Sequence, residues 1–198
     1  MTVIGLTGPT GSGKTTALRV LEGMGFMVID CDALYYELLK TDGELRRRLV
    51  ETFGNVFLPD GQLDRRTLGT IVFEDSGQLR RLNAIIYPAM DQAVAARIAA
   101  CRGRGVVIDA INLIESGLGR RCDVTVAITA PPQVRLRRIM ERDGINESYA
   151  QKRIDAQKKD AYYRKHCSFL LENRAGSRAE FEALIREFFA DILLDTEE

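Results

Sequence analysis

A phosphate-binding pattern occupies residues 8–15, which read Gly-Pro-Thr-Gly-Ser-Gly-Lys-Thr. Glycines let a backbone curl so that its N–H groups point at one phosphate, and a helix N-terminus adds partial positive charge. In such a loop Lys14 reaches the β- and γ-phosphates and Thr15 holds Mg²⁺. The pattern therefore predicts a nucleoside triphosphate site. The residues expected to bind the nucleotide are Gly8, Gly11, Ser12, Gly13, Lys14, Thr15 and Thr16.

The segments on either side of the loop favour this interpretation. Val3–Thr7 is a short apolar run that predicts a strand leading into the loop. Thr16–Glu22 predicts a helix with Leu18 and Leu21 on one face. A glycine-rich turn that binds nothing has no need of a strand before it and a helix after it, so the context favours a phosphate loop.

Three carboxylates follow predicted strands. Asp30 and Asp32 come at the end of Phe26–Asp30, at the edge where open α/β sheets bind ligands. Either could orient or deprotonate an attacking hydroxyl, or help to place Mg²⁺. One of them also suits the N-cap of the next helix, and Asp32 is well placed for that. Asp109 ends the next strand, where it is either a second metal residue or a structural group.

Arginines are concentrated after Pro131-Pro132, a pair that suits the start of a helix. Arg138 and Arg142 lie four residues apart, so on a helix they would share a face and could reach the same phosphate oxygens. The other interpretation is a solvated charged face. We expect residues 131–165 to form a lid that closes over the transferring group.

The predicted elements alternate between strand and helix, which indicates an α/β fold with a mainly parallel sheet covered on both faces. Between Asp30 and Gly105 the chain makes a long excursion that has a helical pattern. The predicted strands are Val3–Thr7, Phe26–Asp30, Gly105–Asp109, Val124–Thr129 and Phe169–Glu172. The predicted helices of the excursion are Ala33–Lys40, Gly43–Phe53, Asp64–Phe73 and Gln78–Cys101. The last of these has a core-packing stripe of Leu79, Leu82, Ile86, Met90, Val94 and Ile98.

Composition excludes several classes of protein. Of 198 residues, 28 are basic and 28 acidic, so a general nucleic-acid-binding surface is not indicated. No apolar run is long enough to cross a bilayer, and the first residues predict a strand, so we expect a cytoplasmic protein. The four cysteines are widely spaced, as expected of reduced thiols. His166 is the only histidine, and nothing supports a Ser-His-Asp triad.

With these motifs in place, the chain resembles the dephospho-coenzyme A kinase family almost from end to end. The phosphate loop is generic, whereas the segment before Pro88 and the Arg-Asp and Arg-Ile-x-x-Gln motifs are more specific. The resemblance covers Leu6–Thr15, Ile29–Asp32, Phe53–Gly54, Asp60–Arg65, Ile71–Phe73, Arg81–Pro88, Arg138–Asp143 and Arg153–Gln157.

The resemblance implies phosphorylation by ATP, with Mg²⁺, of the ribose 3′-hydroxyl of dephospho-coenzyme A, the last step of coenzyme A synthesis. Asp32 would be the base or hydroxyl-orienting residue, and Lys14 would stabilise the transferring charge. Arg138, Arg142 and Arg153 would belong to the lid. Of these, Arg138 and Arg142 would be catalytic, and Arg153 would bind the nucleotide. Asn173 matches an asparagine near the adenine of ATP.

The resemblance also implies a single P-loop kinase domain in three parts. The nucleotide-binding core would be residues 1–31, 105–130 and 166–198. A helical insertion, residues 32–104, would bind the acceptor, and residues 131–165 would be the lid. We expect a small-molecule substrate, no nucleic acid or membrane partner, and a monomer or weak homo-oligomer.

The sequence departs from the family pattern mainly on the acceptor side. Tyr36 replaces an arginine, Tyr87 a histidine, Ser168 an aspartate and Arg135 a glutamine, and Asn112 lies in an altered segment after the third strand. Two alternatives stay open: a P-loop kinase for another nucleoside-like or small hydroxylated acceptor, and a nucleotide-binding regulator without turnover. Tyr36, Tyr87 and Asn112 are the residues that could favour the first, because they alter the polar lining where the family pattern differs. The second is disfavoured because Lys14, Thr15, Asp32, Arg138 and Arg142 are all present.

Overall fold

The computed structural model describes residues 1–73 and 75–195, which form two compact units. One unit comprises Met1–Ile29 and Cys101–Glu198, and the other comprises Asp30–Ala100. The five strands form one sheet in the order β2-β3-β1-β4-β5. They are β1 (Thr2–Thr7), β2 (Phe26–Asp30), β3 (Gly105–Asp109), β4 (Val124–Thr129) and β5 (Phe169–Glu172), as the sequence predicts.

Parallel pairing brings the ends of the central strands together at one edge of the sheet. β1 pairs in parallel with β3 and β4, and β4 pairs in parallel with β5. Leu6, next to the phosphate loop, is in register with Asp109 at the end of β3. Every residue of β4 is buried, which fits the predicted strand covered on both faces. The α/β fold class is therefore confirmed.

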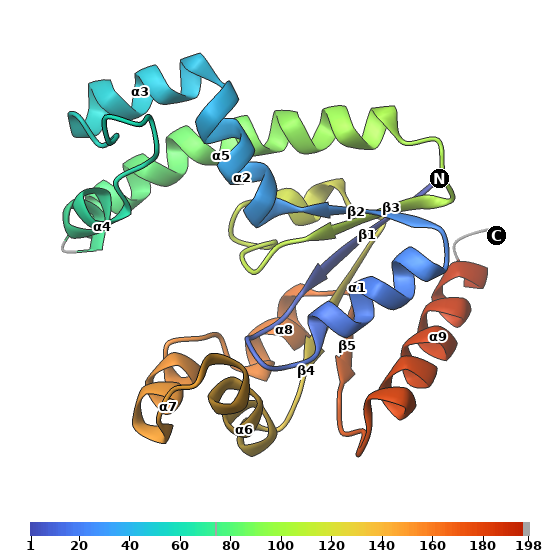
Figure 1. The fold of residues 1–198 in the computed structure, drawn as a ribbon. Helices are drawn as coiled ribbons and strands as arrows, with labels where there is room; N and C mark the ends of the chain where they lie inside the picture. The colour runs from blue at the N-terminus through green and yellow to red at the C-terminus, as the bar shows by residue number, and fades with distance from the viewer. Residues whose placement is uncertain (74, 196–198) are drawn as a thin grey trace. The chain divides into compact units, whose positions relative to one another are not determined.

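Two helices pack side by side on one face of this sheet. Helix α1 (Lys14–Gly23) contacts α9 (Arg178–Asp195), as Figure 1 shows. Their apolar side chains join those of the strands in the main core, in which Leu6, Leu21 and Phe189 are fully buried. This core fixes the start of α1, and with it the end of the phosphate loop.

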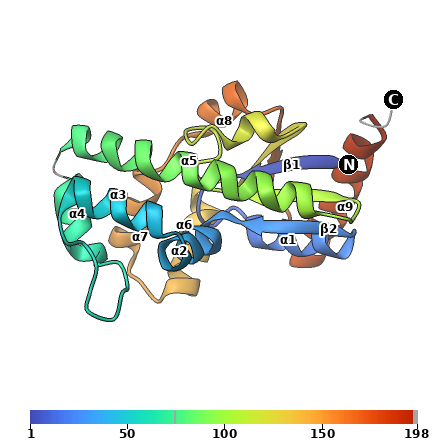
Figure 2. The same ribbon diagram turned by 90° about the horizontal axis from the view of Figure 1, so that it is seen from above.

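The unit of residues 30–100 is helical. Its long helix α5 packs against the other three (Figure 2). The buried side chains of α5 are Leu82, Ile85, Met90 and Val94. Leu79 was expected in the stripe but is 37% exposed, because the buried face begins one turn later. The helices are α2 (Cys31–Thr41), α3 (Gly43–Phe53), α4 (Arg65–Phe73) and α5 (Ser76–Ala100).

The arginine-rich segment forms short helices after β4. A small apolar cluster that includes Leu136, Ile139, Ala150 and Ile154 joins the first two. These elements are α6 (Pro132–Asp143), α7 (Glu147–Asp155) and α8 (Asp160–His166), and a 3-10 turn, η1 (Leu118–Arg121), precedes β4. The division into core, insertion and lid stays a prediction. Within the described residues no helix is both long and apolar enough to cross a membrane.

Candidate active site

Three glycines of the phosphate loop, Gly8, Gly11 and Gly13, have positive φ angles that other residues rarely adopt. Gly8 has φ +139°, and a Cβ there would lie 2.1 Å from the Ile128 carbonyl oxygen, so only glycine fits. Gly13, φ +108°, is the N-cap of α1 and supplies no side-chain cap. The first turn of α1 therefore lacks the side-chain cap that a serine or aspartate would give, and the Thr16 N–H donates to the Gly13 carbonyl oxygen at 2.9 Å. Such an end is suited to a phosphate.

Lys14 and Asp109, predicted separately as phosphate and metal groups, lie together. The Lys14 ammonium is 2.5 Å from the Asp109 carboxylate. Both side chains are mostly buried, at 18% and 15% exposure. The parallel pairing of β1 with β3 explains their meeting, because it brings the loop and the end of β3 to the same edge.

Arg138 faces the loop from α6. Its Nη1 donates to the carbonyl oxygens of Gly11, at 3.2 Å, and Ser12, at 3.4 Å. Burial, and then the neighbouring Arg137, lower the pKa of Arg138. The guanidinium is thus held against the backbone that would surround a phosphate.

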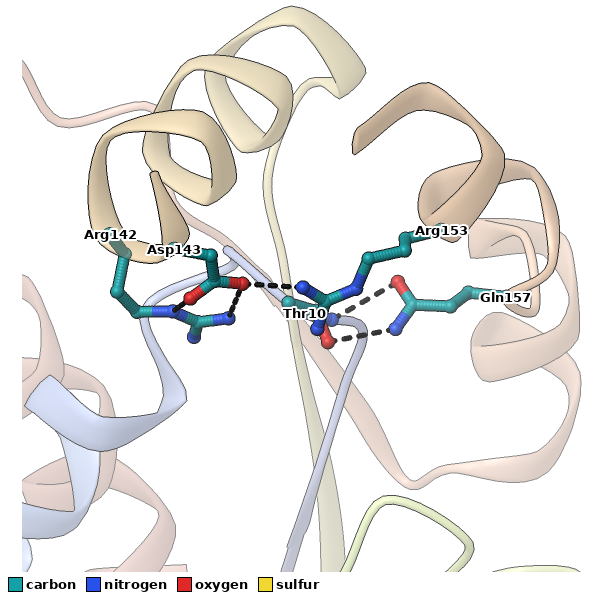
Figure 3. A network of polar contacts seen from close by, with 5 residues as sticks. All are labelled: Thr10, Arg142, Asp143, Arg153 and Gln157. Atoms are coloured by element: carbon teal, nitrogen blue, oxygen red, sulfur yellow. Dashed lines mark hydrogen bonds and ion pairs between the residues drawn. The ribbon is translucent and has the colours of Figure 1, made fainter. Parts of the chain in front are cut away.

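Arg142 and Arg153 share another partner, Asp143 (Figure 3). Arg142 donates to Asp143 from Nε at 2.7 Å and from Nη2 at 3.0 Å, and Arg153 donates at 2.5 Å. The hydrogen bond from Arg142, with a further one from Arg153, lowers the pKa of Asp143 to about 2. Arg138 and Arg142 therefore contact different groups in this structure, not one shared point.

Asn173, just after β5, lies beneath the loop and is 2% exposed. Its Nδ2 donates to the Ser12 carbonyl oxygen at 2.9 Å, and its backbone N–H donates to Thr129 at 2.7 Å. Gly13 allows this contact, because a Cβ there would lie 2.6 Å from Nδ2. Asn173 thus packs against the loop backbone, and its expected place near adenine stays a prediction.

Asp30 and Asp32 belong to the helical unit. Asp30, not Asp32, is the N-cap of α2: its Oδ1 accepts from the Ala33 N–H at 2.9 Å. The helix begins at Cys31, two residues before Ala33, where it would begin if Asp32 were the cap. Asp32 lies exposed in the first turn. Its carboxylate is therefore not the cap, and its role as base or hydroxyl-orienting residue stays a prediction.

A polar pocket in the same unit is lined by residues that include Tyr36, Lys40, Gln62 and Arg65. The Arg65 guanidinium lies over the Tyr36 ring, 4.4 Å from its centroid. Burial, and then Tyr36, raise the pKa of the adjacent Tyr35 to about 12, so that phenol is neutral. The basic side chains of Lys40 and Arg65 line this pocket.

A family model described as Dephospho-CoA kinase matches residues 2–179. The chain belongs to the dephospho-CoA kinase family. It is 38% identical over 194 residues to a dephospho-CoA kinase from Geobacter sulfurreducens, covering 96% of this chain and 98% of that one. The solved structure TT1252 from Thermus thermophilus matches with a TM-score of 0.79 at 29% identity, over 96% and 97% of the two chains. A dephospho-CoA kinase from Campylobacter jejuni shares the fold, with a TM-score of 0.68 at 21% identity over 96% of each chain.

One departure from the dephospho-CoA kinase pattern lies away from the loop. The Ser168 N–H donates to Thr125 Oγ1 at 2.9 Å, and Ser168 Oγ accepts from the Thr125 N–H at 3.2 Å. Both residues lie at the amino ends of parallel strands, opposite the edge with the phosphate loop. Ser168 therefore serves the pairing of β4 with β5.

Sequence reasoning gave no role to three residues that the structure brings to the site. Arg135 and Gln157 bind Thr10 in the phosphate loop, and Asp143 accepts hydrogen bonds from Arg142 and Arg153. Helical spacing does place Arg135 on the face of Arg138 and Arg142. The Thr10 partner of Arg135 and Gln157 lies far away in the sequence, so no local pattern predicts that contact in this member of the dephospho-CoA kinase family.

Proposed function

We propose that this protein transfers the γ-phosphoryl group of ATP to the ribose 3′-hydroxyl of dephospho-coenzyme A, giving coenzyme A and ADP. The observation that carries the proposal is membership of the dephospho-CoA kinase family over nearly the whole chain. The phosphate loop, with Lys14 beside Asp109, supports it physically. We also propose a cytoplasmic protein that is monomeric or associates weakly.

On the nucleotide side, the residues supply positive charge and positioning. We assign the first-turn N–H groups of α1 and the Lys14 ammonium to the β- and γ-phosphates. Arg138 lies against the loop already, and Arg142 and Arg153 would exchange Asp143 for phosphate oxygens. These groups stabilise the charge that develops during transfer, which is the main catalytic task in phosphoryl transfer.

The residues present fit a magnesium ion. Mg²⁺ is usually held by one or two protein oxygens together with substrate phosphates and water. Thr15 and Asp109 offer a hydroxyl and a carboxylate near the loop. Within the described residues no group of three or more His, Cys, Asp or Glu is placed to hold a metal ion. When bound, the ion would neutralise phosphate charge.

On the acceptor side, we assign Asp32 to the 3′-hydroxyl, which it would orient or deprotonate. Arg65 and Lys40 in the pocket of Tyr36 are suited to the diphosphate of the acceptor, because both carry positive charge. The family pattern has an arginine at position 36, where this chain has Tyr36. The guanidinium of Arg65 lies over the Tyr36 ring and supplies a positive charge at that place. The departure at Tyr36 is therefore compatible with an anionic acceptor.

The test is ADP release from ATP and Mg²⁺, with dephospho-coenzyme A beside a panel of nucleosides and small sugars. Turnover of about 1 s⁻¹ or more, confined to dephospho-coenzyme A, is the expected result. Mass spectrometry of the product should show one added phosphate on the ribose. Turnover on another hydroxyl alone would favour the second candidate, a kinase with changed specificity, which rests on Tyr36, Tyr87 and Asn112. ATP binding without turnover would favour the regulator.

A further inference from the structure

Thr10 in the phosphate loop is held at three atoms by two side chains from outside the loop. Its N–H donates to Gln157 Oε1 at 3.1 Å, and its Oγ1 accepts from Gln157 Nε2 at 2.9 Å (Figure 3). Its carbonyl oxygen accepts from Arg135 Nε at 3.0 Å. The backbone donor, the backbone acceptor and the hydroxyl of one residue are thus all engaged.

The two side chains also bind each other. Arg135 Nη2 donates to Gln157 Oε1 at 2.5 Å. Arg135 is only 5% exposed, and burial lowers its pKa. A buried guanidinium is costly unless its N–H groups are bonded, so these bonds stabilise it where it lies. Arg135 comes from α6 and Gln157 from the chain after α7. Two elements therefore meet at Thr10.

The loop needs such external support because of its composition. Glycines at positions 8, 11 and 13 leave its backbone free to move, and ordering a backbone costs about 1–2 kcal/mol per residue. The N–H groups that would face the triphosphate follow Thr10 directly. Contacts that fix Thr10 before the nucleotide arrives reduce the ordering cost of binding.

We propose that Arg135 and Gln157 are positioning residues that preorganise the phosphate loop for the nucleotide by fixing Thr10. The proposal rests on the phosphate-loop part of the proposed function and not on the acceptor. It also gives a role to Arg135, a departure from the family pattern. Because neither side chain is assigned to the reacting atoms, their loss should weaken nucleotide affinity more than it slows the chemical step.

The experiment measures the Kd of Mg-ADP by isothermal titration calorimetry on the full chain, with no acceptor present. Gln157→Leu, which removes all three bonds of the amide, should raise the Kd about tenfold. Gln157→Glu keeps the two accepting bonds and should restore most of the affinity. The matched control is Gln151→Leu, which removes an α7 amide that donates to Asp155 in the same helix. Its Kd should stay within about twofold of the wild type.

Thr10→Val tests the same contact in case the Gln157→Leu chain folds poorly, because this substitution removes only the Thr10 hydroxyl from the contact. It should raise the Kd several-fold, and in the double variant the two losses should not add, because they remove the same bond. In turnover assays, the KM for ATP should rise while kcat changes less than twofold. Wild-type Kd values in Gln157→Leu and Thr10→Val, or an equal loss in Gln151→Leu, would overturn the proposal. ADP binding without phosphorylation of dephospho-coenzyme A would instead refute the proposed function and leave this inference standing.

Discussion

The Lys14 ammonium lies 2.5 Å from the Asp109 carboxylate, and this ion pair joins the first turn of α1 to the carboxyl end of β3. A charge-assisted hydrogen bond of this kind fixes the direction of a long, flexible lysine side chain. An incoming phosphate would meet an ammonium already placed at the loop, and it would compete with Asp109 for it. The pair therefore links the predicted phosphate and metal groups.

Removal of the lysine charge tests this arrangement. Lys14→Met should lower kcat by about a hundredfold or more, because the developing phosphate charge loses a preorganised cation. Steady-state ADP release gives kcat and the KM for ATP. Lys165→Met, an exposed lysine of α8, is the matched control and should keep wild-type kinetics. Unchanged kinetics in Lys14→Met would undermine the phosphate-loop assignment itself.

The two aspartates after β2 should differ sharply under the same substitution. Asp32→Asn removes the proposed base and should cut turnover by about 10²-fold or more, with ATP affinity nearly intact. Asp30→Asn should leave turnover near the wild-type value, because asparagine also accepts from the Ala33 N–H as an N-cap. Single-turnover assays with calorimetric ATP binding separate the two effects. Wild-type turnover in Asp32→Asn would contradict the assignment.

The loop and the strands were predictable because their signals are local. The phosphate-loop glycines, the apolar strand before them and the helix after them lie within one short stretch of sequence. The ends of β2 and β3 were predicted correctly for the same reason. Parallel pairing then follows from the alternation of strand and helix, and it accounts for the meeting of Lys14 with Asp109.

Contacts between distant segments were not predictable. Gln157 and Thr10 are separated by most of the chain, and no spacing rule pairs them. The pairing of Asp143 with Arg142 and Arg153 was not predicted either, and the expectation that Arg138 and Arg142 reach the same phosphate oxygens stays a prediction. The choice of Asp30 over Asp32 as the cap depends on the residue at which the backbone becomes helical, and prediction locates that boundary only to within a few residues.

The titration of Asp143 should reveal its arginine partners. Its pKa is lowered from 3.8 to about 2, first by the hydrogen bond from Arg142 and then by that from Arg153. The folded state therefore binds this proton more weakly than the unfolded state. The resulting stabilisation is complete above about pH 5 and is lost as the pH falls from about 4 toward 2.

Carboxyl ¹³C NMR on the labelled protein measures that pKa directly. In Arg142→Gln we expect the titration midpoint of Asp143 to rise toward 3.8, because the hydrogen bond that lowers its pKa most is lost. Arg137 lies on the same helix and pairs with Glu141, not with Asp143. The control Arg137→Gln should therefore leave the midpoint of Asp143 unchanged. A wild-type midpoint near 3.8 would show that the two arginines are not held by Asp143 in solution.

The pocket of Tyr36 should decide affinity for the acceptor. Arg65→Ala should raise the KM for dephospho-coenzyme A about tenfold or more, because a guanidinium suited to its diphosphate is lost, while the KM for ATP stays constant. Arg66→Ala, its exposed neighbour in α4, is the matched control and should change neither value by more than about twofold. Tyr36→Leu removes the ring beneath Arg65 and should give a smaller rise, since the charge remains but its support is lost. Equal KM values for dephospho-coenzyme A in Arg65→Ala and the wild type would place the acceptor diphosphate elsewhere, even if Asp32 proves to be the base.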